Sequence, residues 1–329
     1  MTDILHTALC DLLGARYPIL LAGMGGVARS ELVAAVTRAG GYGFLGMVRE
    51  APDFIEGEIR ALREATALPF GVNLIPAATA PDLLEAEVAV CLAEKVQSVC
   101  LFWDVFPDLV RRLKDAGIIV LHQVGSLADA EAALAAGADA LIVQGIEAGG
   151  HVRGTTPWTA LLPEVRALTR KPIAVAGGIT DGADLARALR AGADGVWVGT
   201  AFLATRESFA HDYHKDRVVQ SPGDTVHTDV FHRNWPKGAP VRVLPNSVTR
   251  GERGDPWAED AIEIAREGGR PIHLFSTDSP LRNTVGDLEA MALYAGTGAG
   301  RVIGILPAGE RLRRMADDAA RILGGEDAR

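Results

Sequence analysis

The sequence predicts an α/β fold, a closed (β/α)8 barrel with an additional C-terminal segment that caps the barrel mouth. The first reason is that short apolar runs of strand length alternate with helical stretches, the pattern of a parallel sheet built from βα units. The second reason is their number, because eight such runs are enough to close a barrel. An open doubly wound sheet is the less favoured alternative, since no Gly-x-Gly-x-x-Gly follows the first run.

The eight expected strands are apolar without strict polar alternation. Strands covered on both faces have this composition. In chain order, the expected strands are Ile19–Ala22, Tyr42–Gly46, Phe70–Leu74, Ser98–Phe102, Ile118–Gln123, Ala140–Val143, Ile173–Ala176 and Gly195–Val198.

The expected helices end in a recurring Ala-Gly pair just before a strand. Glycine at that place supplies a left-handed C-cap. The pairs end at Gly40, Gly117, Gly137 and Gly192. Two of them extend to the longer match Ala-Gly-Ala-Asp, at residues 136–139 and 191–194, which is consistent with repetition of one βα unit.

The alternating pattern stops after Arg206. We therefore divide the chain into a barrel at residues 1–207, a C-terminal segment at residues 208–309 and a last amphipathic helix at residues 310–329 that packs on the barrel. The part from Ser208 to Gly269 is rich in proline, histidine and tryptophan, and we expect it to line the substrate pocket. A peripheral or oligomer-forming decoration is the alternative.

Composition narrows the class of protein. The 329 residues are 48% hydrophobic and 23% charged, which excludes a disordered chain. No apolar run approaches the roughly 20 residues of a membrane span, and no secretory signal is evident at the start, so a cytoplasmic protein is expected. The net charge of −9 argues against a nucleic-acid partner. Monomer and homodimer remain open.

The cysteines and histidines give no pattern typical of a metal site. Cys10, Cys91 and Cys100 are widely spaced and are interpreted as reduced thiols. His211 and His214 have the spacing of a short ligand pair, but they lack a cysteine partner or a His-Glu-x-x-His arrangement, so no metal is expected.

A glycine-rich loop after the sixth expected strand suggests an active site. Residues 144–154 read Gln-Gly-Ile-Glu-Ala-Gly-Gly-His-Val-Arg-Gly. Gly149 and Gly150 would let the main chain approach a planar ligand, and His151 would place an acid/base or hydrogen-bonding group beside it. Glu147 is expected to make a structural hydrogen bond or ion pair. Taken alone, the loop fits an ordinary turn with an exposed histidine at least as well.

Two further glycine pairs predict a phosphate site. Ala176-Gly177-Gly178-Ile179 ends the seventh expected strand and Gly199-Thr200 ends the eighth. These are the two loops with which such barrels commonly hold a phosphate, through backbone N–H groups and a hydroxyl. Tight turns without a ligand, or a sugar phosphate in place of a flavin, are the alternatives.

Together with Pro18–Met24, Phe70–Leu74 and Gly199–Ser208, these motifs resemble the nitronate monooxygenase family, formerly called 2-nitropropane dioxygenases, over roughly residues 15–210. The resemblance implies an FMN-dependent TIM barrel with the cofactor held at the carboxyl ends of the strands. The candidate cofactor-binding residues are Met24, Asn73, Gln123, Gln144, Gly149, Gly150, Ala176, Gly177, Gly178, Gly199 and Thr200. Strand alternation allows only one of His122 and Gln123 to face inward, and we favour Gln123.

The chain departs from the family pattern at a few positions. Gly23 stands where the family usually has proline, Gln123 where some members have lysine, and Thr297 where many have glutamine. The substrate is therefore the least certain part of the resemblance, whereas backbone donors support most of the flavin assignment.

The resemblance implies oxidation of alkyl nitronates or nitroalkanes by O2 to a carbonyl compound and nitrite. His151 is the candidate catalytic residue, as the base for a neutral nitroalkane or as the group that orients the nitro oxygens of a nitronate. An alternative is an NAD(P)H-dependent FMN reductase of the enoyl-ACP reductase or quinone reductase type, which shares the loop and the barrel. A third class is a flavin- or phosphate-binding protein without enzymatic activity.

Overall fold

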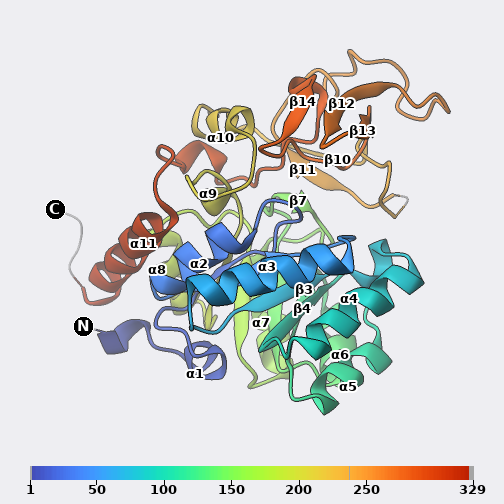
Figure 1. Cartoon of the computed structure of the whole chain (residues 1–329). Helices are drawn as coiled ribbons and strands as arrows, with labels where there is room; N and C mark the ends of the chain where they lie inside the picture. Colours follow the sequence, from blue (N-terminus) through green and yellow to red (C-terminus); the bar gives the residue numbers. More distant parts are fainter. Residues whose placement is uncertain (1, 237, 326–329) are drawn as a thin grey trace.

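The computed structural model describes residues 2–236 and 238–325, and its central feature is a closed barrel of eight parallel strands (Figure 1). β9 pairs with β1 and so closes the barrel. The strands are β1 (Ile19–Leu21), β2 (Tyr42–Gly46), β3 (Gly71–Leu74), β4 (Ser98–Phe102), β5 (Ile119–Val124), β6 (Ala140–Gln144), β8 (Ile173–Ala176) and β9 (Gly195–Val198). The predicted fold class is confirmed.

Seven helices follow the strands and cover the outside of the barrel. They are α2 (Ser30–Arg38), α3 (Pro52–Ala65), α4 (Pro81–Ala93), α5 (Pro107–Asp115), α6 (Leu127–Ala136), α7 (Trp158–Leu168) and α8 (Gly182–Arg190). Local sequence explains several boundaries: proline opens α3, α4 and α5, and the side chains of Ser126 and Asp181 cap α6 and α8. The four predicted C-cap glycines all have positive φ, as expected.

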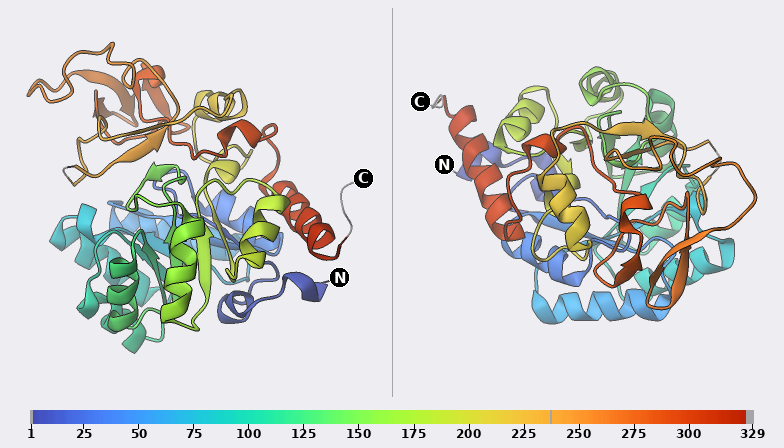
Figure 2. Two further views of the ribbon diagram at one scale, coloured as in Figure 1. Left: turned by 180° about the vertical axis from the view of Figure 1, so that it is seen from behind. Right: turned by 90° about the horizontal axis from the view of Figure 1, so that it is seen from above.

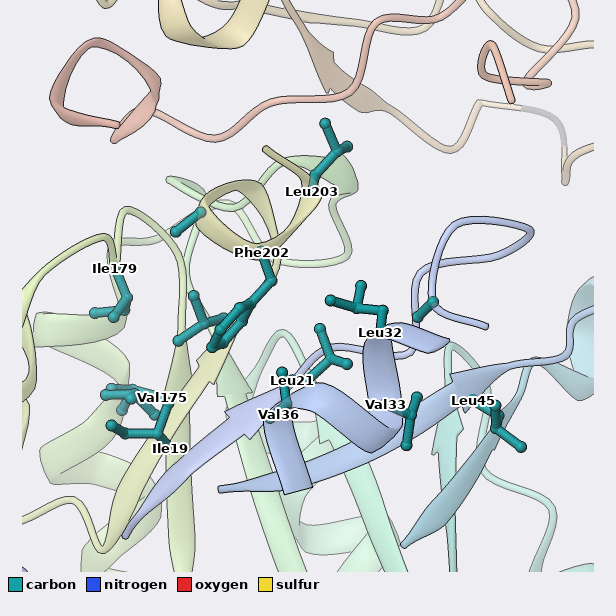
Figure 3. Packing of buried hydrophobic residues seen from close by; sticks show 14 of the residues in the cluster. Ile19, Leu21, Leu32, Val33, Val36, Leu45, Val175, Ile179, Phe202 and Leu203 are labelled. Atoms are coloured by element: carbon teal, nitrogen blue, oxygen red, sulfur yellow. The ribbon is translucent and has the colours of Figure 1, made fainter. Parts of the chain in front are cut away.

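Apolar side chains alternate between two packed layers. Ile19 and Leu21 of β1 belong to the outer layer, where Figure 3 shows Leu21 beside Val36 of α2 and Ile19 beside Val175, whereas Leu20 belongs to the cluster inside the barrel. Leu9 and Leu13 of α1 (Ala8–Leu13) pack against the interior residues from the amino-terminal face of the barrel. The barrel is therefore filled and closed below, which leaves the carboxyl ends of the strands as the face for a ligand.

The C-terminal segment lies over the carboxyl ends of the barrel strands (Figures 1 and 2). It follows α9 (Thr200–Leu203) and forms two small sheets, of order β10-β11-β7 and β13-β12-β14. Its elements are α10 (Asp212–Val219), β10 (Val226–Thr228), β11 (Val241–Val243), β12 (Glu263–Glu267), β13 (Arg270–His273) and β14 (Thr284–Gly286). β7 (Gly150–His151) belongs to the loop after β6, so the first of these sheets joins the segment to the barrel.

The last helix returns to the barrel. α11 (Ala308–Leu323) packs against α8 and α2, so it occupies the place of the helix that would follow β9 (Figure 2). Its buried face includes Leu312, Met315 and Ala319. The C-terminal segment is thus an excursion between a barrel strand and its helix. Of the stretch 310–329, residues 326–329 lie outside the described residues, as do residues 1 and 237.

The three cysteines and the pair His211 and His214 are buried or hydrogen-bonded within the protein. Cys10, Cys91 and Cys100 are buried free thiols. His211 caps α10 by accepting a hydrogen bond from the Tyr213 N–H at 3.0 Å, and His214 is buried with its Nε2 3.0 Å from the Tyr294 carbonyl oxygen. Across the described ranges, no group of three or more potential metal ligands occurs, and no helix has both the length and the apolarity to cross a membrane.

Short 3-10 turns complete the secondary structure. They are η1 (Thr2–Leu5), η2 (Pro76–Ala78), η3 (Leu288–Ala290) and η4 (Ala299–Arg301). The loop at residues 295–298, just before η4, lies against the glycine loop that follows β6, because the Thr297 N–H donates to the Glu147 carbonyl oxygen at 3.0 Å. The far end of the chain therefore contributes to the barrel mouth.

Candidate active site

A cavity of about 880 Å³ opens at the carboxyl ends of the strands, beneath the C-terminal segment. Every candidate site residue of the sequence lines this cavity, although they come from all along the barrel. They are Met24, Asn73, Gln123, Gln144, Gly149, Gly150, His151, Ala176, Gly177, Gly178, Gly199 and Thr200. Their convergence places glycine loops and one histidine around a single space of a size typical of ligand sites.

The loops after β8 and β9 form a cradle of backbone donors. The N–H groups of Gly177, Gly178 and Gly199 donate to no acceptor within residues 2–236 and 238–325. Gly177 and Gly178 have φ of 120° and 68°, a backbone region that other residues rarely adopt. The Thr200 hydroxyl accepts from the Gly296 N–H at 2.9 Å, which leaves its own hydrogen free for a ligand. Such convergent donors form an anion-binding concavity.

The carboxylates near the cradle are engaged with protein groups. Asp184 accepts hydrogen bonds from the N–H and the hydroxyl of Thr180, at 2.9 and 3.1 Å, and pairs with Arg301 at 2.8 Å. Arg301 also donates to the Gly178 carbonyl oxygen at 2.7 Å and so fixes the glycine loop. Free N–H groups together with paired carboxylates fit the phosphate of the FMN that the resemblance implies.

The floor of the cavity explains one departure from the family pattern. A Cβ at Gly23 would lie 2.2 Å from the Cβ of Asn73, so a residue with a side chain, proline included, does not fit there. Asn73 is buried and its Nδ2 donates to the Cys100 carbonyl oxygen at 3.2 Å. Gln123 lines the cavity, whereas His122 is buried outside the lining with its Nδ1 3.0 Å from the Gln123 carbonyl oxygen. The inward position of Gln123 agrees with strand alternation.

The loop after β6 is held in place by hydrogen bonds from its own residues. Gln144 Nε2 donates to the His151 carbonyl oxygen at 2.8 Å, and its Oε1 accepts from the Arg153 N–H at 2.9 Å. The Glu147 carboxylate accepts from the Trp158 N–H at 3.3 Å, the structural role expected for it. Gln144 thus lines the cavity and also shapes the loop that presents the histidine.

Gly149 is close to protein rather than to open space. A Cβ there would lie 2.4 Å from the Gly296 N atom, so the close approach that requires glycine is to the loop at residues 295–298. Gly150 differs, because a Cβ would meet nothing within 4 Å and its φ of 78° is what favours glycine. Both glycines were predicted to let the main chain approach one planar ligand. In the structure, the nearby loop requires glycine at position 149 and the positive φ favours glycine at position 150.

His151 is positioned by the C-terminal segment. Its backbone pairs with Val241 of β11, and its imidazole packs against Trp235 with ring centroids 3.4 Å apart and the ring planes tilted by 33°. Burial, together with the positive charge of Arg49, lowers the pKa of His151 to about 3. The imidazole is therefore neutral at physiological pH, and its buried Nε2 has no hydrogen-bond partner among the described residues.

Several cavity residues were missed by sequence reasoning. Arg49 follows β2 at the catalytic face, and this position was the one signal available for it. Trp235 lies in the part from Ser208 to Gly269 that was expected to line the pocket, but it was not singled out. Arg270 and Asp278 also line the cavity and pair with each other at 2.9 Å. No local pattern marks Trp235, Arg270 or Asp278, because the C-terminal segment has weak periodicity.

Comparisons with known proteins identify a family. A family model described as nitronate monooxygenase matches residues 6–318. A (3aS,4S,5R,7aS)-5-hydroxy-7a-methyl-1-oxo-octahydro-1H-indene-4-carboxyl-CoA dehydrogenase of Mycobacterium tuberculosis is 39% identical over 272 residues, covering 81% of this chain and 74% of that protein.

Two solved structures resemble the whole chain. FabK from Thermotoga maritima has a TM-score of 0.84 and 31% identity, covering 97% of this chain and 98% of that one. A nitroalkane oxidase from Streptomyces ansochromogenes has a TM-score of 0.78 and 31% identity, covering 97% and 99%. The similar proteins thus share a fold and have names that denote different substrates.

Proposed function

The chain belongs to the nitronate monooxygenase family, and from that premise we propose that it is an FMN-dependent oxidoreductase that oxidises alkyl nitronates with dioxygen to carbonyl compounds and nitrite. The observation that supports this substrate most directly is the neutral His151, with a free Nε2, in a cavity that also contains the cation Arg49. A nitronate is an anion with two adjacent oxygen acceptors, so it matches a hydrogen-bonding group beside a positive charge.

The cradle would hold the cofactor. The N–H groups of Gly177, Gly178 and Gly199 and the Thr200 hydroxyl are the donors available for the phosphate of FMN. Met24, Asn73 and Gln123 lie on the cavity floor that would face the ring system. When bound, FMN supplies electron transfer between an organic substrate and dioxygen.

The protein itself would bind and orient the substrate. A histidine with a pKa of about 3 is a poor proton acceptor at neutral pH, so deprotonation of a neutral nitroalkane by His151 is disfavoured. The same neutral ring can donate a hydrogen bond from Nε2 to an oxygen of a preformed nitronate. Trp235 packs against the imidazole and helps to fix its position. We therefore assign His151 an orienting role.

A second candidate is an NAD(P)H-dependent FMN reductase acting on a larger acyl substrate. The specific observation in its favour is the cavity volume of about 880 Å³, near the upper end of ordinary ligand sites and large for a flavin beside a short nitronate. The names of the similar carboxyl-CoA dehydrogenase and FabK point in the same direction.

Anaerobic reduction of the purified protein separates the two candidates. The visible flavin absorbance is recorded after addition of propyl nitronate, NADH or NADPH, and oxygen uptake and nitrite are then measured in air. Bleaching by the nitronate with nitrite release supports the monooxygenase. Rapid bleaching by NADH or NADPH, with none by the nitronate, would instead establish the reductase. Purified protein that neither contains nor takes up FMN would refute both.

A further inference from the structure

Three arginines line the cavity, and their charges are compensated differently. Arg270 pairs with Glu267 at 2.8 Å and with Asp278 at 2.9 Å. Arg29 lies over the ring of Phe209, 3.5 Å from its centroid, and has Glu267 at 3.9 Å. Arg49 has no carboxylate within 4.0 Å in the part of the chain that the structure describes. Arg49 is therefore the cavity arginine that makes no ion pair among the described residues.

The backbone of Arg49 is held in an unusual conformation. Its φ is 60°, in the left-handed region that costs a residue with a side chain of the order of 1–3 kcal/mol. The guanidinium donates from Nη1 to the carbonyl oxygen of Asn234, whose own φ is 66°. Such strain persists where the surrounding structure imposes it, and it gathers at ligand sites. Here it brings the side chain to the residue that precedes Trp235.

Arg49 is half-buried, and its charge reaches groups that line the cavity. It contributes to the lowered pKa of His151 and to the lowered pKa of Asp278, although burial is the largest influence on His151. Two polar atoms nearby are buried without a partner among the described residues, Nε2 of His151 and Nε1 of Trp235. Trp235 is 9% exposed, so its N–H lacks water as well. A cation and two unpartnered ring nitrogens are groups that a ligand with oxygen atoms could satisfy.

We propose that Arg49 binds the anionic group of the substrate, a compact planar oxyanion, through the N–H groups that the Asn234 carbonyl leaves free. The guanidinium is a planar fork that matches two oxygens of one anion, as a nitronate presents them. Arg49 then determines which substrates bind productively beside His151. This inference rests on the proposed function and names the residue that recognises its substrate.

The test uses inorganic nitrate, a planar oxyanion, titrated calorimetrically into the purified flavoprotein. Arg49→Gln is expected to weaken nitrate binding roughly tenfold or more, since hydrogen bonds to charged groups are the strong ones. Arg270→Gln removes the same charge from the same cavity, and we expect a much smaller change because Arg270 is already paired. Absence of nitrate binding by the natural protein, or equal losses in both variants, would overturn the proposal.

Arg49→Gly separates recognition from a structural role. Glycine tolerates a φ of 60°, so the melting temperature should stay constant or rise while nitrate binding is lost. A lower melting temperature with nitrate binding retained would make Arg49 a structural link to Asn234 and would overturn the inference.

Kinetics distinguish this inference from the proposed function. Arg49→Gln should raise KM for propyl nitronate more than it lowers kcat, because a binding contact is removed. If the natural protein turns over propyl nitronate and Arg49→Gln leaves KM unchanged, the inference about Arg49 is wrong and the proposed function still stands. Nitrate binding that depends on Arg49, in a protein that does not oxidise nitronates, defeats the proposed reaction and leaves the anion site standing.

Discussion

The two ends of the cavity are built from different parts of the polypeptide. At the cradle, the loops after β8 and β9 present backbone N–H groups, and glycines provide the conformation and the room. At the other end, side chains determine the chemistry: Arg49 comes from the loop after β2, His151 from the loop after β6 and Trp235 from the C-terminal segment. A backbone site suits a constant phosphate, whereas a site made of side chains can vary with the substrate.

The similar proteins have names that denote different substrates. A nitroalkane oxidase, a carboxyl-CoA dehydrogenase and FabK resemble this chain at 31–39% identity. We expect changes at the cradle to remove the cofactor and changes at the other end to alter kinetics while the cofactor stays bound. The predictions below test that division.

The largest effect is expected from Gly178→Asp. The substitution adds negative charge and a side chain at a φ of 68°, where N–H groups would meet a phosphate. Two penalties of about 1–3 kcal/mol each should weaken FMN binding by roughly a hundredfold or more. Flavin content after purification and FMN titration provide the measurement.

Gly192→Asp is the matched control for that variant. Gly192 also has positive φ, 94°, but it follows α8 and lies outside the cavity lining. The control should lose some stability and keep its flavin. If both variants lose FMN equally, the loss reflects backbone strain and not a phosphate site.

His151→Ala should keep FMN and lower kcat/KM for propyl nitronate by about tenfold to a hundredfold, since one orienting hydrogen bond disappears. In the natural protein, the pKa of about 3 means that His151 stays neutral throughout the working range, so kcat/KM should not vary with pH between about 5 and 8 on its account. A titration of kcat/KM near 6.5 that disappears in His151→Ala would show an ordinary histidine and contradict the orienting role.

Trp235→Ala should retain FMN and change the substrate range, with KM for propyl nitronate rising about threefold to tenfold and bulkier nitronates improving relative to it. The reason is that Trp235 packs on His151 and also lies 5.5 Å from the ring of Trp103, forming one wall of the cavity. Trp257→Ala is the control, because Trp257 belongs to the same segment but is 51% exposed. Identical kinetics of the two variants would make the segment peripheral to specificity.

The smallest effect is expected on stability, from Glu87→Gln in α4. The Glu87 carboxylate is buried beside the backbone of Arg49 and Glu50, and burial raises its pKa from 4.5 to about 8. A raised pKa stabilises the folded protein fully below about pH 4.5, and this contribution is lost as the pH rises through about 8. The variant should match the natural protein at low pH and melt a few degrees higher at pH 8, in a thermal scan. A higher melting temperature of equal size at both pH values would indicate a packing effect.

The barrel and the cradle could be read from local sequence. Each strand appeared as an apolar run, within one residue of the observed bounds at either end. Gly137, Gly177 and Gly178 have positive φ, a backbone conformation that favours glycine. The residue type itself therefore marks these positions in the sequence. The repeated βα unit then places the ends of β8 and β9 side by side.

Only the tertiary structure brought Arg49, His151 and Trp235 into one site. Residues 49 and 234 join through a hydrogen bond between a side chain and a distant carbonyl, and neither position has a local pattern that could indicate it. Trp235 packs against the His151 ring, and burial together with the charge of Arg49 lowers the histidine pKa to about 3. The environment of the one predicted catalytic residue therefore includes a segment with weak periodicity. A residue that must adopt a positive φ can be recognised in the sequence as glycine. Desolvation and the pairing of charges cannot, because they depend on which distant segments meet in the folded chain.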